Sequence, residues 1–333
     1  MDQTLIIAEI GVNHNGDINL AKEMISAAKD AGVDIVKFQT YKAEEVMTEQ
    51  TPLASYMKGS DVNFLELARR LELTFDETLI LKSYANELGV EFLSSPFDVS
   101  STEFLGSLGM RRLKIPSGEA VNPFILRAAA ATKLPLIMST GMATLEEVRR
   151  SLDFLDHHES GPVTLLHCTT QYPAKPKYCN LRAMTTMAQE FGLPVGYSDH
   201  TEGIEISLAA VALGATVMEK HFTLDKMLPG PDQAASVEPH ELRALVMGIR
   251  NINVAMGNGK KIPWPVEIEV AKVARKSIVS AIAMSAGHVL RYEDLTAKRP
   301  GTGILAMDVD LVVGRKLARD VTNNALLSWP DLV

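Results

Sequence analysis

The sequence predicts an α/β protein: a (β/α)8 (TIM) barrel of about 250 residues, followed by a small β-rich domain. Two observations predict the barrel. Eight short apolar runs alternate with amphipathic segments, and most of these runs follow a glycine that suits a helix C-terminus. A doubly wound sheet is the alternative, but it does not require eight strands. The pattern stops near Gly257, so the expected divisions are a barrel at 1–257, a linker at 258–274 and the small domain at 275–333.

Each expected strand is a short apolar run that ends in polar residues. In chain order the runs are LIIAEIG, AGVDIVKFQT, LGVEFLSSPF, LGMRRLKIPSGE, LPLIMSTGM, VTLLHCTTQYP, FGLPVGYSDHT and LGATVMEKHFT. The segments between them include INLAKEMISAAKDA, TFDETLILKSYANEL, ATLEEVRRSLDFL and IEISLAAVAL, whose apolar residues have helical spacing. Asp76, Thr144 and Thr201 are expected near helix starts, where such side chains act as caps.

Two stretches depart from this repeat. Residues 41–70 are too long for a simple loop, and we expect them to cover the barrel mouth or to contact a partner. The segment MGNGKKIPWPVE is rich in Gly, Pro and Lys and predicts the linker. Beyond it, short runs such as KSIVSAIA, LTAKRP and LVVGRKLA predict the small β-rich domain.

Composition limits the class of protein. Of the 333 residues, 46% are hydrophobic and 22% are charged, which suits one large core and a small second domain. The formal net charge of -8 argues against a nucleic-acid or anionic-membrane surface, because both need an extended basic face. Two cysteines are too few for a disulfide framework, and no basic leader precedes the first apolar run. We therefore expect a cytoplasmic protein without a membrane span.

Polar side chains occur at the C-terminal end of every expected strand, where (β/α)8 barrels carry their reaction sites. One polar strand end is as often explained by solvation, but eight on one rim favour a site. In chain order these ends carry Glu9; Lys37 and Gln39; Ser94 and Ser95; Lys114, Ser117 and Glu119; Ser139 and Thr140; His167, Thr169 and Tyr172; Ser198, Asp199 and His200; and Glu219, Lys220 and His221.

The lysines and histidines indicate two kinds of ligand. Lys37, Lys114 and Lys220, with neighbouring hydroxyls, predict a local anion pocket suited to phosphate and carboxylate. His200 and His221 end adjacent strands and predict a divalent metal with open positions, such as Mn, Fe, Co or Zn. Structural ion pairs and structural histidines are the alternative interpretation of the same residues. No nucleotide-binding fingerprint occurs in the sequence.

Several motifs occur together in one order: AEIGVNHNG, KFQT, KIPSGE, STGM, HCTTQYP, GYSDHT, EKHFT and GPD, followed by KRPGTG. In this order they resemble the sialic acid synthase family, which includes legionaminic acid synthases, over essentially the whole chain. KRPGTG resembles the signature of its C-terminal antifreeze-like (SAF, β-clip) domain. The resemblance implies a condensation of phosphoenolpyruvate with an N-acetylated mannose-type aldose, which releases phosphate and a nine-carbon 2-keto acid.

The resemblance also implies roles for single residues. His200 and His221 would bind the divalent metal, usually assigned as manganese, and Glu119 is the candidate for proton transfer. Thr170 departs from the asparagine that some members have near the phosphate. In a domain-swapped homodimer, Arg299 of KRPGTG would reach the sugar's N-acetyl group in the partner's site. The remaining expected contacts are Lys37, Ser94, Lys114, Ser117, Ser139 and Ser198 around phosphoenolpyruvate, and Glu9, Gln39, Tyr172 and Asp232 around the sugar.

Two aldoses and two other classes of protein stay open. The stretch LDKMLPGPDQAAS is more similar to synthases for sialic or legionaminic acid than to those for pseudaminic acid. The aldose would be N-acetylmannosamine, giving N-acetylneuraminate, or 2,4-diacetamido-2,4,6-trideoxymannose. No extra basic cluster that would require a sugar 6-phosphate is evident. A Schiff-base aldolase using Lys37, Lys114 or Lys220 is the enzymatic alternative, and a carbohydrate-binding or ice-binding protein is the non-catalytic one.

Overall fold

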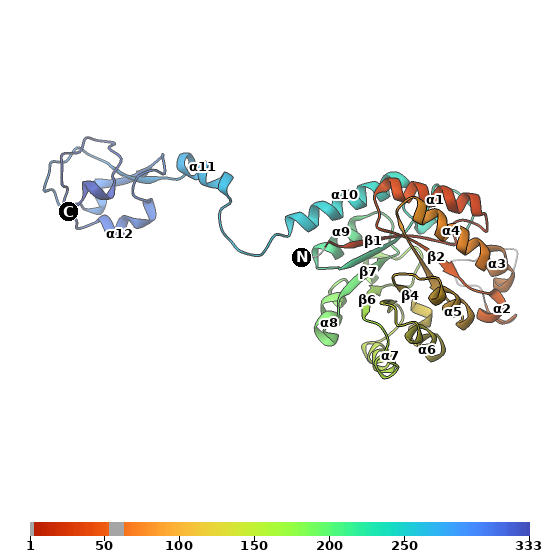
Figure 1. Cartoon of the computed structure of the whole chain (residues 1–333). Helices are drawn as coiled ribbons and strands as arrows, with labels where there is room; N and C mark the ends of the chain where they lie inside the picture. Colours follow the sequence, from red (N-terminus) through yellow and green to blue (C-terminus); the bar gives the residue numbers. More distant parts are fainter. Residues whose placement is uncertain (1–2, 53–62) are drawn as a thin grey trace. The chain divides into compact units, whose positions relative to one another are not determined.

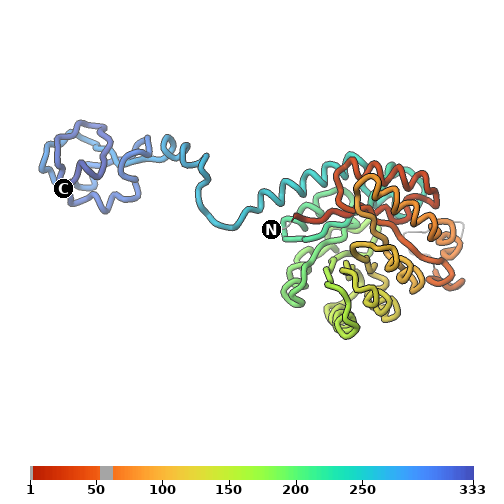
Figure 2. The backbone as a smooth tube through the Cα atoms, in the orientation of Figure 1, coloured from red at the N-terminus to blue at the C-terminus, as the bar shows by residue number. Residues whose placement is uncertain are grey.

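The structure, a computed structural model of the chain, describes residues 3–52 and 63–333. It divides into two compact units, Met1–Gly257 and Asn258–Val333, each of which is described by itself. The first unit is a barrel of parallel strands with helices around it (Figure 1), and its repeating strand-to-helix path can be followed along the backbone (Figure 2). The (β/α)8 barrel predicted from the sequence is therefore confirmed.

The strands of the barrel form one parallel sheet in the order β3-β2-β1-β8-β7-β6-β5-β4. They are β1 (Leu5–Gly11), β2 (Ile35–Thr40), β3 (Glu91–Pro96), β4 (Leu113–Ile115), β5 (Leu136–Ser139), β6 (Val163–Cys168), β7 (Val195–Asp199) and β8 (Val217–His221). The pairing register sets the polar ends opposite one another, with Glu9 beside Lys37 on one side and beside His221 on the other. Residues that are far apart in sequence thus meet at one rim.

The outer helices bury one apolar face each against the strands. In α1 this face is Ala21, Met24, Ile25 and Ala28, at the spacing expected for an amphipathic helix. The helices around the barrel are α1 (Ile18–Ala31), α4 (Phe75–Glu87), α5 (Val99–Ser107), α6 (Pro123–Ala131), α7 (Leu145–His157), α8 (Arg182–Phe191), α9 (Glu205–Ala212) and α10 (Pro239–Ala255).

One of the three predicted helix caps is confirmed. Thr144 is the N-cap of α7 and forms a capping box with Glu147. The N-cap of α4 is Thr74, so Asp76 lies in the first helical turn instead. The prediction for Thr201 is wrong, because α9 begins at Glu205 and the Thr201 hydroxyl donates to a carboxylate of β7.

In its described residues, the segment between β2 and α4 contains two short helices, α2 (Ala43–Val46) and α3 (Phe64–Leu71). Residues 53–62 of the predicted 41–70 insertion lie outside the described residues. With Val12, which follows β1, the described parts form a small apolar cluster that is separate from the barrel core. Its buried members are Val12, Tyr41, Ala43, Leu65, Ala68 and Leu71. We call this set the rim cluster.

The second unit has its own small core and a two-stranded antiparallel sheet of β9 (Ser277–Ser280) and β10 (Leu295–Lys298). A short helix, α12 (Val309–Val312), and isolated β-bridges complete it. The range predicted as a linker contains α11 (Pro265–Ala274), because Pro265 at the first helical position favours a helix start. In residues 3–52 and 63–333, no helix has the length and apolar composition that a membrane crossing needs.

Candidate active site

The C-terminal ends of the barrel strands surround a pocket of about 460 Å³. Its polar lining combines carboxylates, ammonium groups, hydroxyls and imidazoles from all parts of the rim. These residues are Glu9, Lys37, Gln39, Ser95, Lys114, Ser117, Ser139, Thr170, Tyr172, Ser198, His200, Glu219, His221 and Asp232. Most of the site residues predicted from the sequence therefore line a single pocket.

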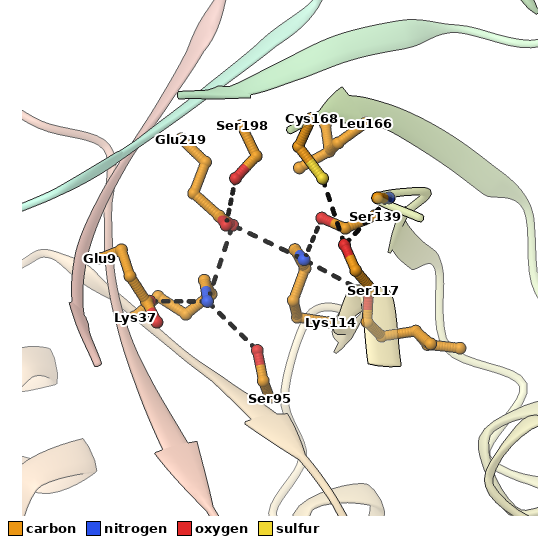
Figure 3. Close-up of polar contacts among 12 residues, drawn as sticks. Glu9, Lys37, Ser95, Lys114, Ser117, Ser139, Leu166, Cys168, Ser198 and Glu219 are labelled. Carbon is orange, nitrogen blue, oxygen red and sulfur yellow. Dashed lines mark hydrogen bonds and ion pairs between the residues drawn. The ribbon is translucent and has the colours of Figure 1, made fainter. Parts of the chain in front are cut away.

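Glu9, Lys37, Lys114 and Glu219 form a buried charged set that we call the lysine–glutamate group, and their side chains point toward one another (Figure 3). Lys37 Nζ lies 2.6 Å from Glu9 Oε2 and 3.7 Å from Glu219 Oε2. Lys114 Nζ lies 3.9 Å from the same oxygen of Glu219, which accepts no hydrogen bond. Because these contacts to Glu219 are longer than hydrogen bonds, the ammonium groups keep capacity for another anion.

Burial and charge shift the pKa values of this group in different directions. Burial raises the pKa of Glu9 to about 7, although the Lys37 ammonium opposes the shift. Burial also raises the pKa of Glu219, but attraction to Lys114 and Lys37 outweighs burial, and a hydrogen bond from Ser198 Oγ at 3.0 Å adds to it, so the net shift is downward. Glu219 is thus ionised near neutral pH, whereas Glu9 exchanges a proton there.

Serine hydroxyls accept hydrogen bonds from both ammonium groups. Lys37 Nζ donates to Ser95 Oγ at 3.2 Å, and Lys114 Nζ donates to Ser139 Oγ at 2.6 Å. Burial lowers the pKa of Lys114, while attraction by the two glutamates raises that of Lys37 in spite of its burial. The two lysines therefore sit in distinct environments within one group.

Ser95, and not Ser94, belongs to the pocket lining. The Ser94 hydroxyl is fully buried and pairs with Thr40 Oγ1 at 2.7 Å. Successive residues of a strand point to opposite faces, so only one of the two serines can face the lysines. Ser95 therefore occupies the place beside the lysines that the sequence predicted for Ser94.

Ser117 and Thr170 meet at a corner of the pocket beside Gly141. Ser117 Oγ accepts a hydrogen bond from Gly141 N–H at 3.1 Å and lies 3.1 Å from Cys168 Sγ. A Cβ added at Gly141 would lie 2.3 Å from Thr170 Oγ1 and 2.8 Å from Ser117 Oγ. The corner therefore requires glycine, a residue that the sequence did not single out. Burial raises the pKa of Cys168, which keeps its thiol neutral.

The two predicted metal ligands lie together beside an aromatic ring. The rings of His200 and His221 have centroids 5.3 Å apart, and the Tyr172 ring is 4.3 Å from His200. His200 Nδ1 is 2.8 Å from the Thr169 carbonyl, which only accepts, so this nitrogen carries the proton and Nε2 keeps a lone pair. His221 Nδ1 has no hydrogen-bond partner and lies 3.9 Å from Asp232 Oδ2.

These imidazoles suit a divalent ion. Burial lowers the pKa of His200 and, more strongly, that of His221, so both rings are neutral and have the protonation state that a metal requires. Among the described residues, no group of three or more His, Cys, Asp or Glu side chains is arranged to hold an ion. Two imidazoles would thus leave the other coordination positions to oxygen atoms of substrate or water.

Lys220 does not join the anion pocket that the sequence predicted for it. Its Nζ donates to Asp199 Oδ2 at 2.9 Å and to the Thr201 carbonyl, and Asp199 also accepts from Thr201 and Ser207. We call Asp199, Thr201, Ser207 and Lys220 the lysine–aspartate group. Strand alternation explains the difference, because the residues on either side of Lys220 both face the pocket.

Two further predicted residues are not on the lining. Glu119 lies in the turn after β4 and accepts a hydrogen bond from Asn122 Nδ2 at 2.6 Å. Partial burial raises its pKa, so it shares that property with Glu9 without facing the pocket. Arg299 belongs to the second unit, where its Nε donates to the Ala274 carbonyl at 3.1 Å.

Apart from Tyr41, the rest of the pocket lining is apolar. It comes largely from α2, α3 and the rim cluster, so the described part of 41–70 lies at the barrel mouth, one of the two locations that the sequence left open for it. Apolar residue type alone does not distinguish a pocket wall from a core, which is why none of these side chains was predicted as a site residue. They are Val12, Val46, Met47, Phe64, Leu67, Ala68, Leu71, Phe97 and Met142.

Comparisons with known proteins cover both units. The model of the NeuB family matches residues 24–261, and that of the SAF domain matches residues 275–333. N,N'-diacetyllegionaminic acid synthase of Legionella pneumophila is 46% identical, covering 98% of this chain and 94% of its own. The protein of the same name from Campylobacter jejuni is 44% identical, covering 98% of this chain and 99% of its own.

A more distant relative and a solved structure extend the comparison. The N-acetylneuraminate-9-phosphate synthase of Homo sapiens is 36% identical, covering 94% of this chain and 88% of its own. The crystal structure of an N-acetylneuraminic acid (sialic acid) synthetase from Leptospira borgpetersenii, in complex with citrate, superposes with a TM-score of 0.74. It is 38% identical and covers 81% of this chain and 90% of its own.

Proposed function

Because the chain belongs to the NeuB family, we propose that it condenses phosphoenolpyruvate with an N-acetylated mannose-type aldose. The products are phosphate and a nine-carbon 2-keto sugar acid. One observation carries the proposal: Lys37 and Lys114, buried and with capacity for an anion, lie in the same pocket as the neutral imidazoles of His200 and His221. A trianionic substrate and a carbonyl substrate need such a combination.

The lysine–glutamate group would receive phosphoenolpyruvate. The ammonium groups of Lys37 and Lys114 offset its charge, and the hydroxyls of Ser117, Ser139 and Ser198 bind its oxygen atoms. The Glu219 carboxylate lies within 4 Å of both lysines, and its negative charge favours their charged forms before the anion arrives. The site is therefore organised for an anion before the substrate binds.

We propose that His200 and His221 hold a divalent ion, with manganese the first candidate. A bound ion of this kind supplies a Lewis acid that polarises the aldehyde oxygen of the sugar. The Thr169 carbonyl fixes the His200 ring in the tautomer that leaves Nε2 free. Tyr172 packs against both rings and limits their rotation.

In the reaction, the alkene carbon of phosphoenolpyruvate attacks the aldehyde carbon, and water adds to the carbon that carries the phosphate ester. The C–O bond to phosphate then breaks, leaving the 2-keto acid. Glu9 is the better placed carboxyl to exchange a proton with the sugar, because it lines the pocket and its pKa is raised to about 7. Gln39 and Asp232 remain available to bind sugar hydroxyls.

Two aldoses are candidates for the second substrate. The relatives named N,N'-diacetyllegionaminic acid synthase support 2,4-diacetamido-2,4,6-trideoxymannose. The N-acetylneuraminate-9-phosphate synthases, at lower identity, support an N-acetylmannosamine-type sugar and hence N-acetylneuraminate as the acid formed. Incubating the protein with phosphoenolpyruvate and each sugar separately, with mass spectrometry of the products, decides between them.

Isotope labelling and trapping test the reaction class. Oxygen-18 in the bridging C–O position of phosphoenolpyruvate should leave with phosphate, and label retained in the sugar acid contradicts C–O cleavage. Borohydride trapping of a lysine adduct with pyruvate would instead indicate a Schiff-base aldolase. No consumption of phosphoenolpyruvate with any N-acetylated aldose would leave a carbohydrate-binding protein as the better reading.

Metal binding has a direct test. His221→Ala should lose manganese binding in calorimetry and lose turnover, while its unfolding transition stays cooperative. His240→Ala is the matched control, because that side chain is 77% exposed and lies on α10 outside the pocket. Equal manganese affinity in both variants would remove His221 from the metal site.

We also propose a domain-swapped homodimer in which Arg299 serves the partner's pocket. Helix α11 supports an interface, since it has no buried residue and its Val266, Val270 and Val273 are 75%, 63% and 70% exposed. Arg299→Ala and His221→Ala chains, each inactive alone, should regain up to about a quarter of wild-type activity when mixed. No recovery after verified subunit exchange contradicts the swap.

A further inference from the structure

One side of the pocket is apolar and comes from the segment between β2 and α4. Met47, Phe64 and Leu67 lie on the pocket lining and are only half-buried, whereas the rim cluster residues next to them are buried. We call these three residues the apolar wall. Half-buried apolar side chains that face a pocket keep contact area for a ligand.

The described basic side chains of this segment, and the hydroxyl of Tyr41, have partners within the segment. In its described parts every basic side chain pairs with an acidic one, and these pairs are Lys42–Glu45, Arg69–Glu44 and Arg70–Glu66. Tyr41, the polar lining residue of the segment, donates its hydroxyl to the Ala68 carbonyl at 3.1 Å. Among the described residues of this segment, a hydroxyl or phosphate pressed against the wall would therefore lose water without gaining a partner.

The position of the wall indicates which part of a substrate meets it. The reacting ends of both substrates must lie among Lys37, Lys114 and the two imidazoles, at the strand ends. Helices α2 and α3 follow the C-terminal end of β2, so the wall belongs to the mouth above those ends. The end of the sugar remote from its aldehyde is the part that extends toward the mouth.

We propose that the apolar wall selects the aldose by this remote end, favouring a 6-deoxy sugar over the same sugar with a 6-hydroxyl or a 6-phosphate. The inference rests on the proposed function and assigns its sugar specificity to Met47, Phe64 and Leu67. A hydrophobic surface rejects an added hydroxyl by up to about 100-fold. It rejects a phosphate more strongly, because the charge would be desolvated without a cation.

The test compares sugars that differ by one oxygen atom. With full-length protein, kcat/KM for 2-acetamido-2,6-dideoxymannose should exceed that for N-acetylmannosamine by about 10- to 100-fold. N-acetylmannosamine 6-phosphate should be poorer than both. A ratio of one or less between the first two sugars overturns the inference.

Polar replacements in the wall should reduce this ratio. Leu67→Asn keeps a similar volume and supplies hydrogen-bonding groups, so the preference should fall at least about fivefold. Met47→Gln repeats the test at the C-cap residue of α2, in case Leu67→Asn does not fold. Leu79→Asn is the control, because Leu79 is 43% exposed on α4 and outside the pocket, and its ratio should equal that of wild type.

The outcomes separate this inference from the proposed function. If no aldose is consumed with phosphoenolpyruvate, the proposed function fails and the inference fails with it. If all three sugars react with equal kcat/KM, or if both wall variants turn over with the wild-type ratio, the function stands and the wall is not the specificity element.

Discussion

Two buried lysine–carboxylate sets lie side by side in the barrel, and they differ in how completely their hydrogen bonds are satisfied. In the lysine–aspartate group, Lys220 has two acceptors and the Asp199 carboxylate also accepts from Thr201 and Ser207. In the lysine–glutamate group, Glu219 Oε2 accepts no hydrogen bond and stays 3.7 and 3.9 Å from its two lysines. Both sets are almost inaccessible. Satisfaction of polar atoms, and not burial, therefore separates the structural set from the one suited to a ligand.

The largest expected effect is on stability, in the satisfied set. Lys220→Met leaves the Asp199 carboxylate buried without its cation, so the free energy of unfolding should fall by about 3–5 kcal/mol. Urea denaturation measures this change. Lys29→Met, at an exposed lysine of α1, should change the value by less than about 0.5 kcal/mol. A Lys220→Met protein as stable as wild type would contradict a structural role.

The next effect is on activity, in the open set. Lys114→Met removes a cation that faces the pocket, so kcat/KM for phosphoenolpyruvate should fall by about 10²–10³. Because Lys114 Nζ lies 3.9 Å from Glu219 Oε2, and Lys37 stays beside that carboxylate, the free energy of unfolding should fall much less than in Lys220→Met. Steady-state kinetics and urea denaturation on the same preparation check both statements. Retained activity would remove Lys114 from the anion site.

Glu9, which belongs to the lysine–glutamate group, should make the stability of the protein depend on pH. Its carboxyl has a pKa of about 7 in the folded chain against an ordinary 4.5, so between these values the unfolded chain ionises while the folded chain keeps the proton. Its contribution to stability therefore declines as pH rises from about 4.5 to about 7 and is constant above. Between pH 4.5 and 7, the free energy of unfolding of Glu9→Gln should rise by about 1–3 kcal/mol relative to that of wild type. Parallel pH profiles of the two proteins would contradict the raised pKa.

The smallest expected effects come from a matched pair of serines. Ser207→Ala deletes a hydrogen bond to Asp199 and should lower the free energy of unfolding by about 1–2 kcal/mol without changing KM. Ser95→Ala removes the hydroxyl that accepts a hydrogen bond from Lys37. It should raise KM for phosphoenolpyruvate several-fold and leave the free energy of unfolding nearly constant. Thermal unfolding and kinetics on both variants make the test. Exchanged outcomes would reverse the assignment of the two sets.

The barrel could be predicted because apolar runs alternate with amphipathic segments eight times and a glycine precedes most of the runs, so a single ambiguous segment does not change the count. The sequence also predicted that the two histidines lie near Lys37 and Lys114, because the strand ends of a barrel share one rim, and the four residues line one pocket. Sequence reasoning misassigned Ser94 and Lys220 for one physical reason. Where neighbouring residues are both polar, as in Ser94–Ser95 or Glu219–Lys220, composition does not say which of them faces inward.

Two other features depended on information that residue type does not contain. The range that contains α11 was expected to be a linker because MGNGKKIPWPVE is rich in Gly, Pro and Lys, yet Pro265 stands at the position where proline favours a helix start. The apolar wall was missed because Leu67 and Phe64 look like core residues until the neighbouring strands show that they face a pocket. Both differences arise from tertiary context.

The rim cluster has an evolutionary consequence. Its buried residues form a cluster that is separate from the barrel core. Substitutions in the segment between β2 and α4 therefore alter the packing of this small cluster and leave the packing of the eight strands unchanged. A lineage can therefore rebuild this segment while inheriting the condensation chemistry intact. If the proposed role of the apolar wall holds, exchanging residues 41–71 between relatives should change which nine-carbon acid is formed.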